Sequence, residues 1–425
     1  MLDMHILRQE PERVRAGYRV KHVEAPWERV AELDRQHRGL LQTLEAKKAE
    51  RNRATEEVAR LRRAHDPAAE GLIADMRRLG DEIRGLEEQR HPIREELEQL
   101  MWELPNLPEA SVPEGEGEAD NPEVARWGTP RPDSPGVTPH WDQGPALGIL
   151  DFERAQKLAG ARFVVLRGFG AQLSRGLVNF MLADAEQSGY EEVAPPVLAL
   201  ADSLYASGQF PKFVEDVFHV SPHDLYLIPT AEVPLVNLRR EEILDEDELP
   251  LHYTAHTASF RSEAGAAGRD TRGLIRRHQF DKVELVAVAR AEDGLAELEA
   301  MRRQSARLLE LLELPYRTVE HCGGDLGFGH AKSYDHEVWM PSYGRYVEIS
   351  SVSLMGDFQA RRAKMRWRAR GQHTTQFPVT LNGSALAVGR TIAALMENHQ
   401  TKAGGFRIPA ALQPFVGGRT EFPPA

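Results

Sequence analysis

Residues 260–284 read FRSEAGAAGRDTRGLIRRHQFDKVE, and this stretch sets the expectation for the fold around it. An arginine and a carboxylate precede a glycine-rich loop, residues 264–273, and an aromatic ring and a second carboxylate follow it. The loop combines conformationally permissive glycines with Arg269 and Arg272, so we predict a β-hairpin with a basic tip. Guanidinium, carboxylate and aromatic groups together are those needed to hold an anionic, aromatic ligand such as ATP.

Length and composition narrow the class of protein. The chain has 425 residues, of which 41% are hydrophobic, so two domains are expected rather than one core. Its single cysteine, Cys322, excludes an internal disulfide framework and a multi-thiolate zinc site, and fits a reducing compartment. The 16 histidines show no HExxH spacing. The sequence lacks an apolar run of about 18 residues and an N-terminal signal pattern, so we expect a cytoplasmic protein outside the membrane.

Residues 27–104 carry a sustained heptad pattern. Apolar positions alternate in steps of three and four from Val30 to Leu61 and again from Leu72 to Leu104. Between the two runs, Asp66-Pro67 offers a helix N-cap followed by proline at the first helical position. The pattern therefore predicts two helices that pair as an antiparallel coiled-coil arm.

The far end of this helical hairpin is predicted to be basic. Residues 47–78 contain nine Lys or Arg and six Asp or Glu, a net charge of +3 in a chain whose formal net charge is -12. Such a tip suits contacts with the phosphate backbone of RNA. Solvated helix faces or dimer contacts explain the same charges, so both interpretations stand at this point.

The rest of the chain divides into a connection and a mixed α/β region. Residues 105–145 are rich in Pro, Gly, Glu and Asp and are expected to be a linker without a core of their own. Beyond them, helical patterns at 151–158, 170–188 and 291–312 alternate with short β-rich runs. The absence of regular βα alternation predicts an α+β domain with a largely antiparallel sheet.

Three further segments combine residue types that carry chemistry. Thr230-Ala231-Glu232 offers a hydroxyl and a carboxylate for an ammonium group, or equally an N-cap. In Glu348-Ile349-Ser350-Ser351, strand alternation predicts that Glu348 and Ser350 share one face, and these oxygen ligands suit Mg²⁺. Residues 383–390 are small until Arg390, which by itself is typical of close strand–helix packing.

In this order, the segments resemble the three signature motifs of class II aminoacyl-tRNA synthetases, most closely those of the seryl-tRNA synthetase family. Motif 1 corresponds to residues 189–196, motif 2 to 260–284 and motif 3 to 383–390. Longer strings carry the subfamily resemblance: TAE at 230–232, RSEAG at 261–265, GRDTRG at 268–273, EISS at 348–351 and DFQARR at 357–362. The resemblance runs over nearly the whole chain, as far as RIP at 407–409 and Gly417-Gly418.

The resemblance implies a division into domains and a set of partners. Residues 1–104 would form a tRNA-binding domain with the long arm, 105–145 a linker, and 146–425 the class II catalytic domain. Motif 1 implies a homodimer. The implied reaction joins L-serine to ATP, giving seryl-adenylate and pyrophosphate, and then transfers the seryl group to tRNA(Ser), and to tRNA(Sec) as well. The arm would bind the outer parts of the tRNA, including its long variable arm.

The same resemblance assigns roles to individual residues. Arg261, Glu348 and Arg390 would be catalytic, and Glu348 with Ser351 would hold Mg²⁺. The ATP-binding set would be Arg261, Ser262, Glu263, Arg277, Phe280, Glu348, Ile349, Ser350, Ser351 and Arg390. The serine-binding set would be Thr230, Ala231, Glu232, Glu284 and Ser384. Within these sets Glu263 would meet the adenine amino group, Phe280 would stack on adenine, and Glu284 with Ser384 would receive the serine hydroxyl.

The chain departs from the family pattern at three places. Val352-Ser353-Leu354 replaces Cys-Ser-Asn, Ala385 replaces a glycine, and Ser333 replaces a threonine. None of these residues has an assigned role. Two alternatives remain from the sequence: a related ligase that loads an amino acid on a carrier other than tRNA, and a non-catalytic RNA-binding relative.

Overall fold

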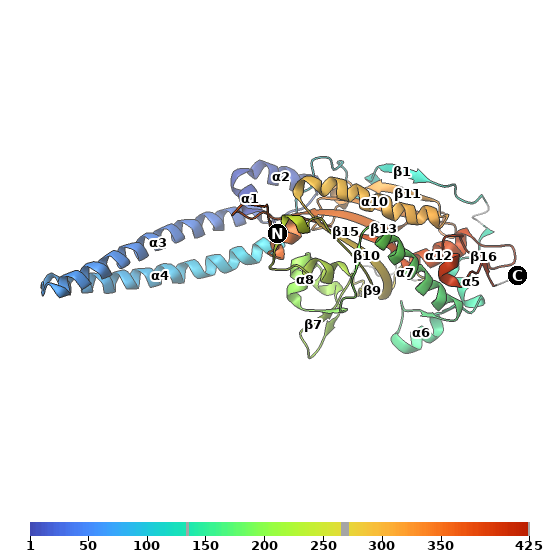
Figure 1. The fold of residues 1–425 in the computed structure, drawn as a ribbon, viewed down its shortest axis with the longest axis horizontal. Helices are drawn as coiled ribbons and strands as arrows, with labels where there is room; N and C mark the ends of the chain where they lie inside the picture. Colours follow the sequence, from blue (N-terminus) through green and yellow to red (C-terminus); the bar gives the residue numbers. More distant parts are fainter. Residues whose placement is uncertain (133–135, 265–271, 424–425) are drawn as a thin grey trace. The chain divides into compact units, whose positions relative to one another are not determined.

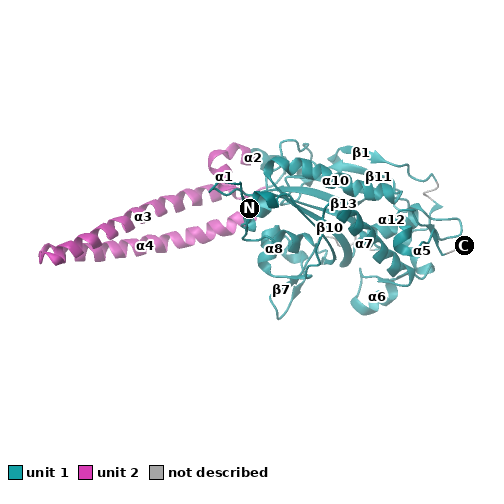
Figure 2. Ribbon diagram, viewed as in Figure 1, with its two compact units in different colours: residues 1, 16–23, 105–425 teal, residues 2–15, 24–104 magenta. Residues whose placement is uncertain are grey.

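The chain forms two compact units in a computed structural model that describes residues 1–132, 136–264 and 272–423. The smaller unit contains residues 2–15 and 24–104, and the larger contains residues 1, 16–23 and 105–425 (Figure 2). Among the described residues, no helix combines the length and the apolarity that crossing a membrane requires.

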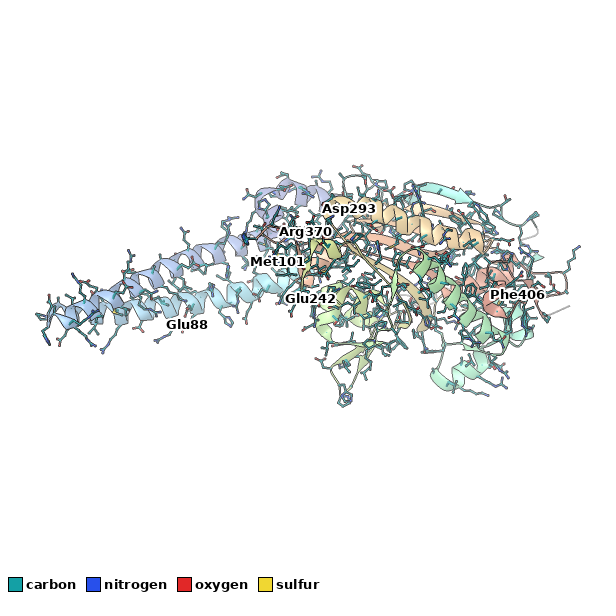
Figure 3. The ribbon with its side chains drawn as sticks, in the orientation of Figure 1. Glu88, Met101, Glu242, Asp293, Arg370 and Phe406 are labelled. Carbon is teal, nitrogen blue, oxygen red and sulfur yellow. The ribbon has the colours of Figure 1, made fainter. Side chains whose placement is uncertain are left out.

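A long helical hairpin dominates the smaller unit. It contains α1 (Met4–Gln9), the beginning of α2 (Pro11–Val20), and the paired helices α3 (Trp27–Arg63) and α4 (Ala68–Glu103) (Figure 1). The side chains of Leu44, Leu79 and Ile83 pack in the seam between α3 and α4. Off the seam, side chains such as Glu88 are exposed (Figure 3). The predicted antiparallel coiled-coil arm is therefore confirmed.

Asp66 lies at the reversal between the two long helices. Its Oδ1 accepts a hydrogen bond from the backbone N–H of Ala68 at 2.9 Å, but Pro67 occupies the cap position of α4, one residue later than the sequence predicted. Ion pairs join the two helices farther along, including Lys47 Nζ to Glu82 Oε2 at 2.5 Å and Arg29 Nε to Glu96 Oε1 at 2.8 Å.

An eight-stranded sheet forms the centre of the larger unit. Its order is β1-β11-β12-β13-β15-β10-β9-β4, and every pairing is antiparallel except that of β4 with β9. The strands are β1 (Glu123–Trp127), β11 (Tyr316–Glu320), β12 (Lys332–Met340), β13 (Arg345–Gly356), β15 (Val379–Ala387), β10 (Gln279–Ala289), β9 (Leu251–Phe260) and β4 (Glu191–Glu192). The expected α+β fold with a mainly antiparallel sheet is confirmed.

Strand β10 shows how the sheet separates core from cavity. Val283 and Leu285 point to one face and join the large hydrophobic core, to which α7 (Phe169–Gln187), α10 (Gly294–Leu311) and α12 (Val388–Asn398) contribute. Phe406, labelled in Figure 3, is 1% exposed within that core. Lys282 and Glu284 point to the opposite face, since successive strand residues alternate. The second face therefore carries polar side chains that can form a binding site.

Smaller elements complete the larger unit. Its remaining helices are α5 (His140–Ala146), α6 (Phe152–Ala159), α8 (Ala201–Ser207), α9 (Glu232–Asn237) and α11 (Phe358–Arg362). Short strands pair outside the main sheet: β2 (Leu150–Asp151) with β3 (Val165–Leu166), β7 (Leu225–Leu227) with β5 (Leu198–Ala199) and β6 (His219–Val220), β8 (Ile243–Asp245) with β14 (Arg366–Arg368), and β16 (Phe406–Arg407) with β17 (Glu421–Phe422).

Residues 105–145 differ from the expectation of a connection without a core. Strand β1 lies in this segment and forms the edge of the main sheet beside β11. The side-chain amide of Asn106 donates to the backbone oxygens of Gly329 and Met355 at 3.0 and 2.8 Å. Leu107 and Val112 are buried. The composition hid these contacts because a chain rich in Pro, Gly and acids can still add one edge strand to a sheet formed by other residues.

Candidate active site

A cavity of about 510 Å³ opens in the larger unit, on the sheet face that carries Lys282 and Glu284. Twelve of the fifteen residues that the family resemblance assigns to the site line it. They are Thr230, Glu232, Arg261, Glu263, Arg277, Phe280, Glu284, Glu348, Ile349, Ser351, Ser384 and Arg390. Residues that lie more than 150 positions apart in the sequence thus meet around one space.

Two central strands supply lining residues by simple alternation. Phe280, Lys282 and Glu284 follow one another at steps of two on β10, and Asn382 and Ser384 do so on β15. Lys282 and Asn382 received no role from the sequence. Lys282 lies two residues from both Phe280 and Glu284 on β10, and Asn382 lies two residues from Ser384 on β15, so strand alternation is the signal that could have found them.

Glu232 is a buried acid held by two amides. The residue is 7% exposed. Its carboxylate oxygen Oε1 accepts hydrogen bonds from Gln359 Nε2 at 2.6 Å and from Asn382 Nδ2 at 3.0 Å. Burial, together with the nearby charge of Glu284, raises the pKa of Glu232 to about 7. The backbone N–H of Glu232 donates to Thr230 Oγ1 at 3.2 Å, which fixes that hydroxyl beside the acid. A cationic group that binds here would favour the ionised form of Glu232.

Glu284 is the second buried acid of the cavity. It is 1% exposed, and its Oε2 forms an ion pair with the ammonium of Lys282. Burial raises the pKa of Glu284, and the Lys282 charge opposes that rise. Two acids and one lysine therefore surround a small polar space next to Ser384.

Arginines and aromatic rings line another part of the cavity. The Arg261 guanidinium lies over the Phe280 ring at 5.2 Å from its centroid, and Arg261 Nε donates to the Pro229 oxygen at 3.4 Å. Arg276 Nη1 donates to Glu263 Oε2 at 3.0 Å, and Glu263 adopts a positive φ of 53°. A non-glycine residue in this region of φ is uncommon and costs energy, which the surrounding structure must offset.

Arg277 is a buried cation on the same wall. It is 6% exposed, and its Nε has no hydrogen-bond partner among the described residues. Burial, followed by the charge of Arg162, lowers the pKa of Arg277 to about 10. Among the described residues Arg277 forms no ion pair with a carboxylate, and a buried guanidinium of this kind suits an anionic ligand.

A β-bulge decides which residues of the EISS segment reach the cavity. On β12, His336 pairs with Ser350 and the next residue, Glu337, pairs with Glu348, so Ile349 is the extra residue on β13. The expectation that Glu348 and Ser350 share a face is therefore wrong, because the bulge interrupts the alternation. Glu348 and Ser351 line the cavity, while the Ser350 hydroxyl donates to the Ser384 oxygen at 2.5 Å.

Glu348 is paired with the arginine of α12. Arg390 Nη1 lies 3.3 Å from Glu348 Oε2 and donates to the Glu348 backbone oxygen at 2.6 Å. The Arg390 charge lowers the pKa of Glu348, so this carboxylate is ionised at neutral pH. Asp335 is a half-buried acid whose pKa is raised by burial and by the Glu348 charge, and its Oδ2 lies 3.0 Å from His321 Nε2.

Ser262, Ala231 and Ser350 are the assigned residues that do not line the cavity. Ser262 Oγ donates to the backbone oxygen of Glu215 at 2.6 Å, which ties the start of the motif 2 loop to a neighbouring segment. Ala231 is fully buried in an apolar cluster. Arg269, the expected loop tip, lies outside the described residues, whereas Arg272 is described and exposed.

The cavity offers few ligands for a metal ion. Among the described residues, no group of three His, Cys, Asp or Glu is placed to hold one. Glu348 and Ser351 offer a carboxylate and a hydroxyl. Mg²⁺ is commonly bound by one or two carboxylates, with phosphate oxygens and water completing its octahedron, so these two residues fit an ion that arrives with a nucleotide.

Two family models match separate parts of the chain. A seryl-tRNA synthetase N-terminal domain matches residues 1–108, and a tRNA synthetase class II core domain (G, H, P, S and T) matches residues 217–399. The serine–tRNA ligase of Caldanaerobacter subterraneus subsp. tengcongensis is 51% identical over 417 residues, 98% of each chain. That of Thermodesulfovibrio yellowstonii is 47% identical over 419 residues, which cover 98% of this chain and 99% of the relative.

The fold is also similar to that of a solved structure. The seryl-tRNA synthetase of Pyrococcus horikoshii, crystallised with ATP, superposes with a TM-score of 0.93 at 36% identity, and the match covers 100% of both chains. The sequence relatives and the fold therefore match over nearly the full length, and the two family models match residues 1–108 and 217–399 within it. The chain belongs to the seryl-tRNA synthetase family of class II aminoacyl-tRNA synthetases.

Proposed function

We propose that this chain is a serine–tRNA ligase, which activates L-serine with ATP and transfers the seryl group to tRNA(Ser), and to tRNA(Sec) as well. One observation carries the proposal: a single cavity combines the buried acids Glu232 and Glu284 with the cations and ring of Arg261, Phe280 and Arg390. The acids suit the ammonium and hydroxyl of an amino acid, and the cations and ring suit a nucleotide. The membership of the family and the ATP-bound relative support the same function.

ATP–pyrophosphate exchange with each of the twenty amino acids tests this function. We expect exchange with serine alone among them. Exchange that does not depend on serine contradicts the proposal. Serine-dependent exchange followed by loading of a carrier protein but not tRNA would favour the related ligase, and inactivity in both assays would favour a non-catalytic relative.

The first step depends on positioning and on neutralising charge. Arg261 would hold the serine carboxylate beside the α-phosphate of ATP, and the pairing of its guanidinium with Phe280 supports that placement. Phe280 would stack on adenine and Glu263 would accept from the adenine amino group. Arg390 would hold the nucleotide from the other side. The carboxylate oxygen of serine then attacks phosphorus, and pyrophosphate leaves.

Specificity for serine would come from the two buried acids. Ionised Glu232, with Thr230, would bind the serine ammonium, and Glu284 with Ser384 would bind its hydroxyl. Alanine keeps the ammonium but lacks the hydroxyl, so it would leave Glu284 and Ser384 without their substrate partner, and sites built to bind a hydroxyl reject analogues without it by ~10⁴ to 10⁵. The extra methyl group of threonine would have to enter a space bounded by Asn382 and Lys282.

The raised pKa of Glu232 predicts how serine binding depends on pH. A carboxyl with a pKa of about 7 is about one-tenth ionised at pH 6 and about nine-tenths ionised at pH 8. Since the ammonium binds the ionised form, the KM for serine in the exchange reaction should fall about tenfold from pH 6 to pH 8.

Two controls accompany that measurement. The Glu232→Gln variant should raise the serine KM throughout and remove its dependence on pH, because the amide does not titrate. The KM for ATP, measured over the same range, separates protonation of the nucleotide from protonation of Glu232. A serine KM that is flat in the native protein would contradict the assignment of Glu232.

Mg²⁺ would bind Glu348 and Ser351 together with phosphate oxygens, and when bound it would neutralise charge on the phosphates. The Glu348→Gln variant keeps the size of the side chain and removes its charge. We expect its half-saturating concentration of free Mg²⁺ in exchange to rise about tenfold or more. The Ser353→Ala variant, which alters a neighbouring lining residue without an assigned Mg²⁺ role, is the matched control. Equal Mg²⁺ dependence of native protein and Glu348→Gln would exclude Glu348 as a ligand.

The two compact units support a division of labour. We propose that residues 1–104 form the tRNA-binding domain, that 105–145 connect it, and that 146–425 carry both chemical steps. The exposed arginines near the tip of the hairpin would bind tRNA phosphates in the cytoplasm. Residues 189–196, which contain β4 at the edge of the main sheet, would form a homodimer interface.

A further inference from the structure

A fully buried histidine and glutamate lie outside the lining of the cavity. Glu397 belongs to the last turn of α12 and His140 begins α5; both side chains are 0% exposed. Glu397 Oε1 accepts from His140 Nδ1 at 2.7 Å and from the His140 backbone N–H at 3.0 Å. Burial disfavours the charged carboxylate, but hydrogen bonds from His140 and Ser342 outweigh it and lower the pKa of Glu397.

The other ring nitrogen of His140 bonds to the motif 2 loop. His140 Nε2 lies 2.9 Å from the backbone nitrogen of Leu274, which carries the hydrogen. Nε2 must therefore be the acceptor, and Nδ1 carries the ring proton that Glu397 receives. The carboxylate fixes the tautomer of a neutral imidazole, and the imidazole in turn holds a main-chain N–H.

The backbone at Gly273 allows this close approach. A Cβ atom on Gly273 would lie 2.0 Å from His140 Nε2, and Gly273 has a φ of 73°. Glycine is favoured at this position for two reasons: a larger side chain would clash with His140, and the backbone has a positive φ. The glycine that precedes Leu274 lets the histidine ring reach the chain.

Helix α12 consequently holds two adjacent residues of the cavity wall. Near its start, Arg390 Nε donates to the Ile275 oxygen at 3.2 Å. Near its end, Glu397 acts through His140 on the Leu274 N–H. Leu274 and Ile275 both line the cavity and lead directly into Arg276 and Arg277, which line it too.

We propose that His140 is a positioning residue for ATP. It links α12 to the Leu274 main chain and so fixes residues 274–277 of the cavity wall, which include Arg276 and Arg277. His140 does not line the cavity and acts only through the Leu274 main chain. The proposal rests on the proposed function, because the site that it positions is the ATP site of that reaction. Its consequence is a selective effect on ATP, with serine binding left unchanged.

Two substitutions separate the two bonds of the ring. In His140→Gln the amide oxygen takes the place of Nε2, so the Leu274 N–H keeps its acceptor. In His140→Asn the amide nitrogen takes the place of Nδ1, so the bond to Glu397 survives and the Leu274 N–H is left unpaired. The backbone N–H of His140 still donates to Glu397 in both variants.

We expect His140→Asn to raise the KM for ATP about tenfold in serine-dependent exchange, the effect of leaving a buried N–H without an acceptor. The KM for serine should change less than about twofold, and His140→Gln should restore most of the ATP affinity. Ser342→Ala is the matched control, because it removes a hydrogen bond to Glu397 at 2.8 Å without touching Leu274. Its KM for ATP should equal that of the native protein.

Equal effects of His140→Asn and His140→Gln, or a parallel rise of the KM for serine, would overturn the proposal and indicate a structural role alone. Should His140→Asn not fold, Gly273→Ala displaces the ring from the loop side, and an unchanged KM for ATP in that variant overturns the proposal as well. Calorimetric binding of ATP alone gives a second readout. Native protein that binds ATP but does not exchange with serine contradicts the proposed function, while the comparison of ATP affinities still tests His140.

Discussion

Serine-dependent ATP–pyrophosphate exchange by the Arg261→Ala variant is expected to be about 10³-fold slower than by the native protein, measured as kcat/KM. Arg261 is the cation that would touch both reacting groups, the serine carboxylate and the α-phosphate. Its guanidinium lies over Phe280 and its Nε donates to the Pro229 oxygen, so these contacts orient the charge within the cavity. Removing it takes away charge neutralisation at the reacting centre and leaves the rest of the wall in place.

Two matched variants make that result specific. Arg261→Lys keeps the charge but lacks the planar fork that binds two oxygens together, so it should recover only part of the rate. Arg303→Ala removes an exposed arginine of α10 that pairs with Glu299, and its exchange rate should equal that of the native protein. Undiminished exchange by Arg261→Ala would refute the assignment of the site, and a loss of kcat/KM that tracks a fall in melting temperature would indicate misfolding.

The elements of the fold that depend on local periodicity were predictable from the sequence. The heptad seam of α3 and α4 and the alternation on β10 each repeat a pattern that a few neighbouring residues contain. Strand β1 was missed because its partner, β11, lies almost 200 residues away and its own composition is that of a loop. Pairing with a distant strand stabilises it, and no local pattern encodes that partner.

The candidate site shows the same limit at the level of single residues. Strand alternation grouped Glu348 with Ser350, whereas the bulge at Ile349 places Glu348 and Ser351 along the cavity, the pair that the family resemblance implied. A bulge depends on how two strands pair, so strand alternation in one of them cannot reveal it. The bond between His140 and Glu397 joins residues 257 positions apart, and no motif marks either of them.

A protein that lacks residues 35–95 is expected to exchange pyrophosphate with serine at close to the native rate and to lose tRNA charging almost completely. The cut removes similar lengths of α3 and α4 and joins Asp34 to Glu96 through a short Gly–Ser turn. The Arg29–Glu96 ion pair below the cut remains. The cavity residues all belong to the larger unit, so the deletion takes away none of them.

Point variants at the tip distinguish binding by the arm from a general effect of truncation. Arg53, Arg62 and Arg77 are exposed, and replacing each by alanine should weaken tRNA binding and reduce the salt dependence of log K by about one unit of slope for every lost phosphate contact. Arg94→Ala, on α4 away from the tip and paired with Glu98, should leave the slope unchanged. Equal loss of exchange and charging in the deletion would contradict the division of labour, since a tRNA-binding arm has no part in the first step. Loss of charging alone, with a salt slope that falls at the tip and not at Arg94, would place the arm's contribution in phosphate contacts made before the seryl group is transferred.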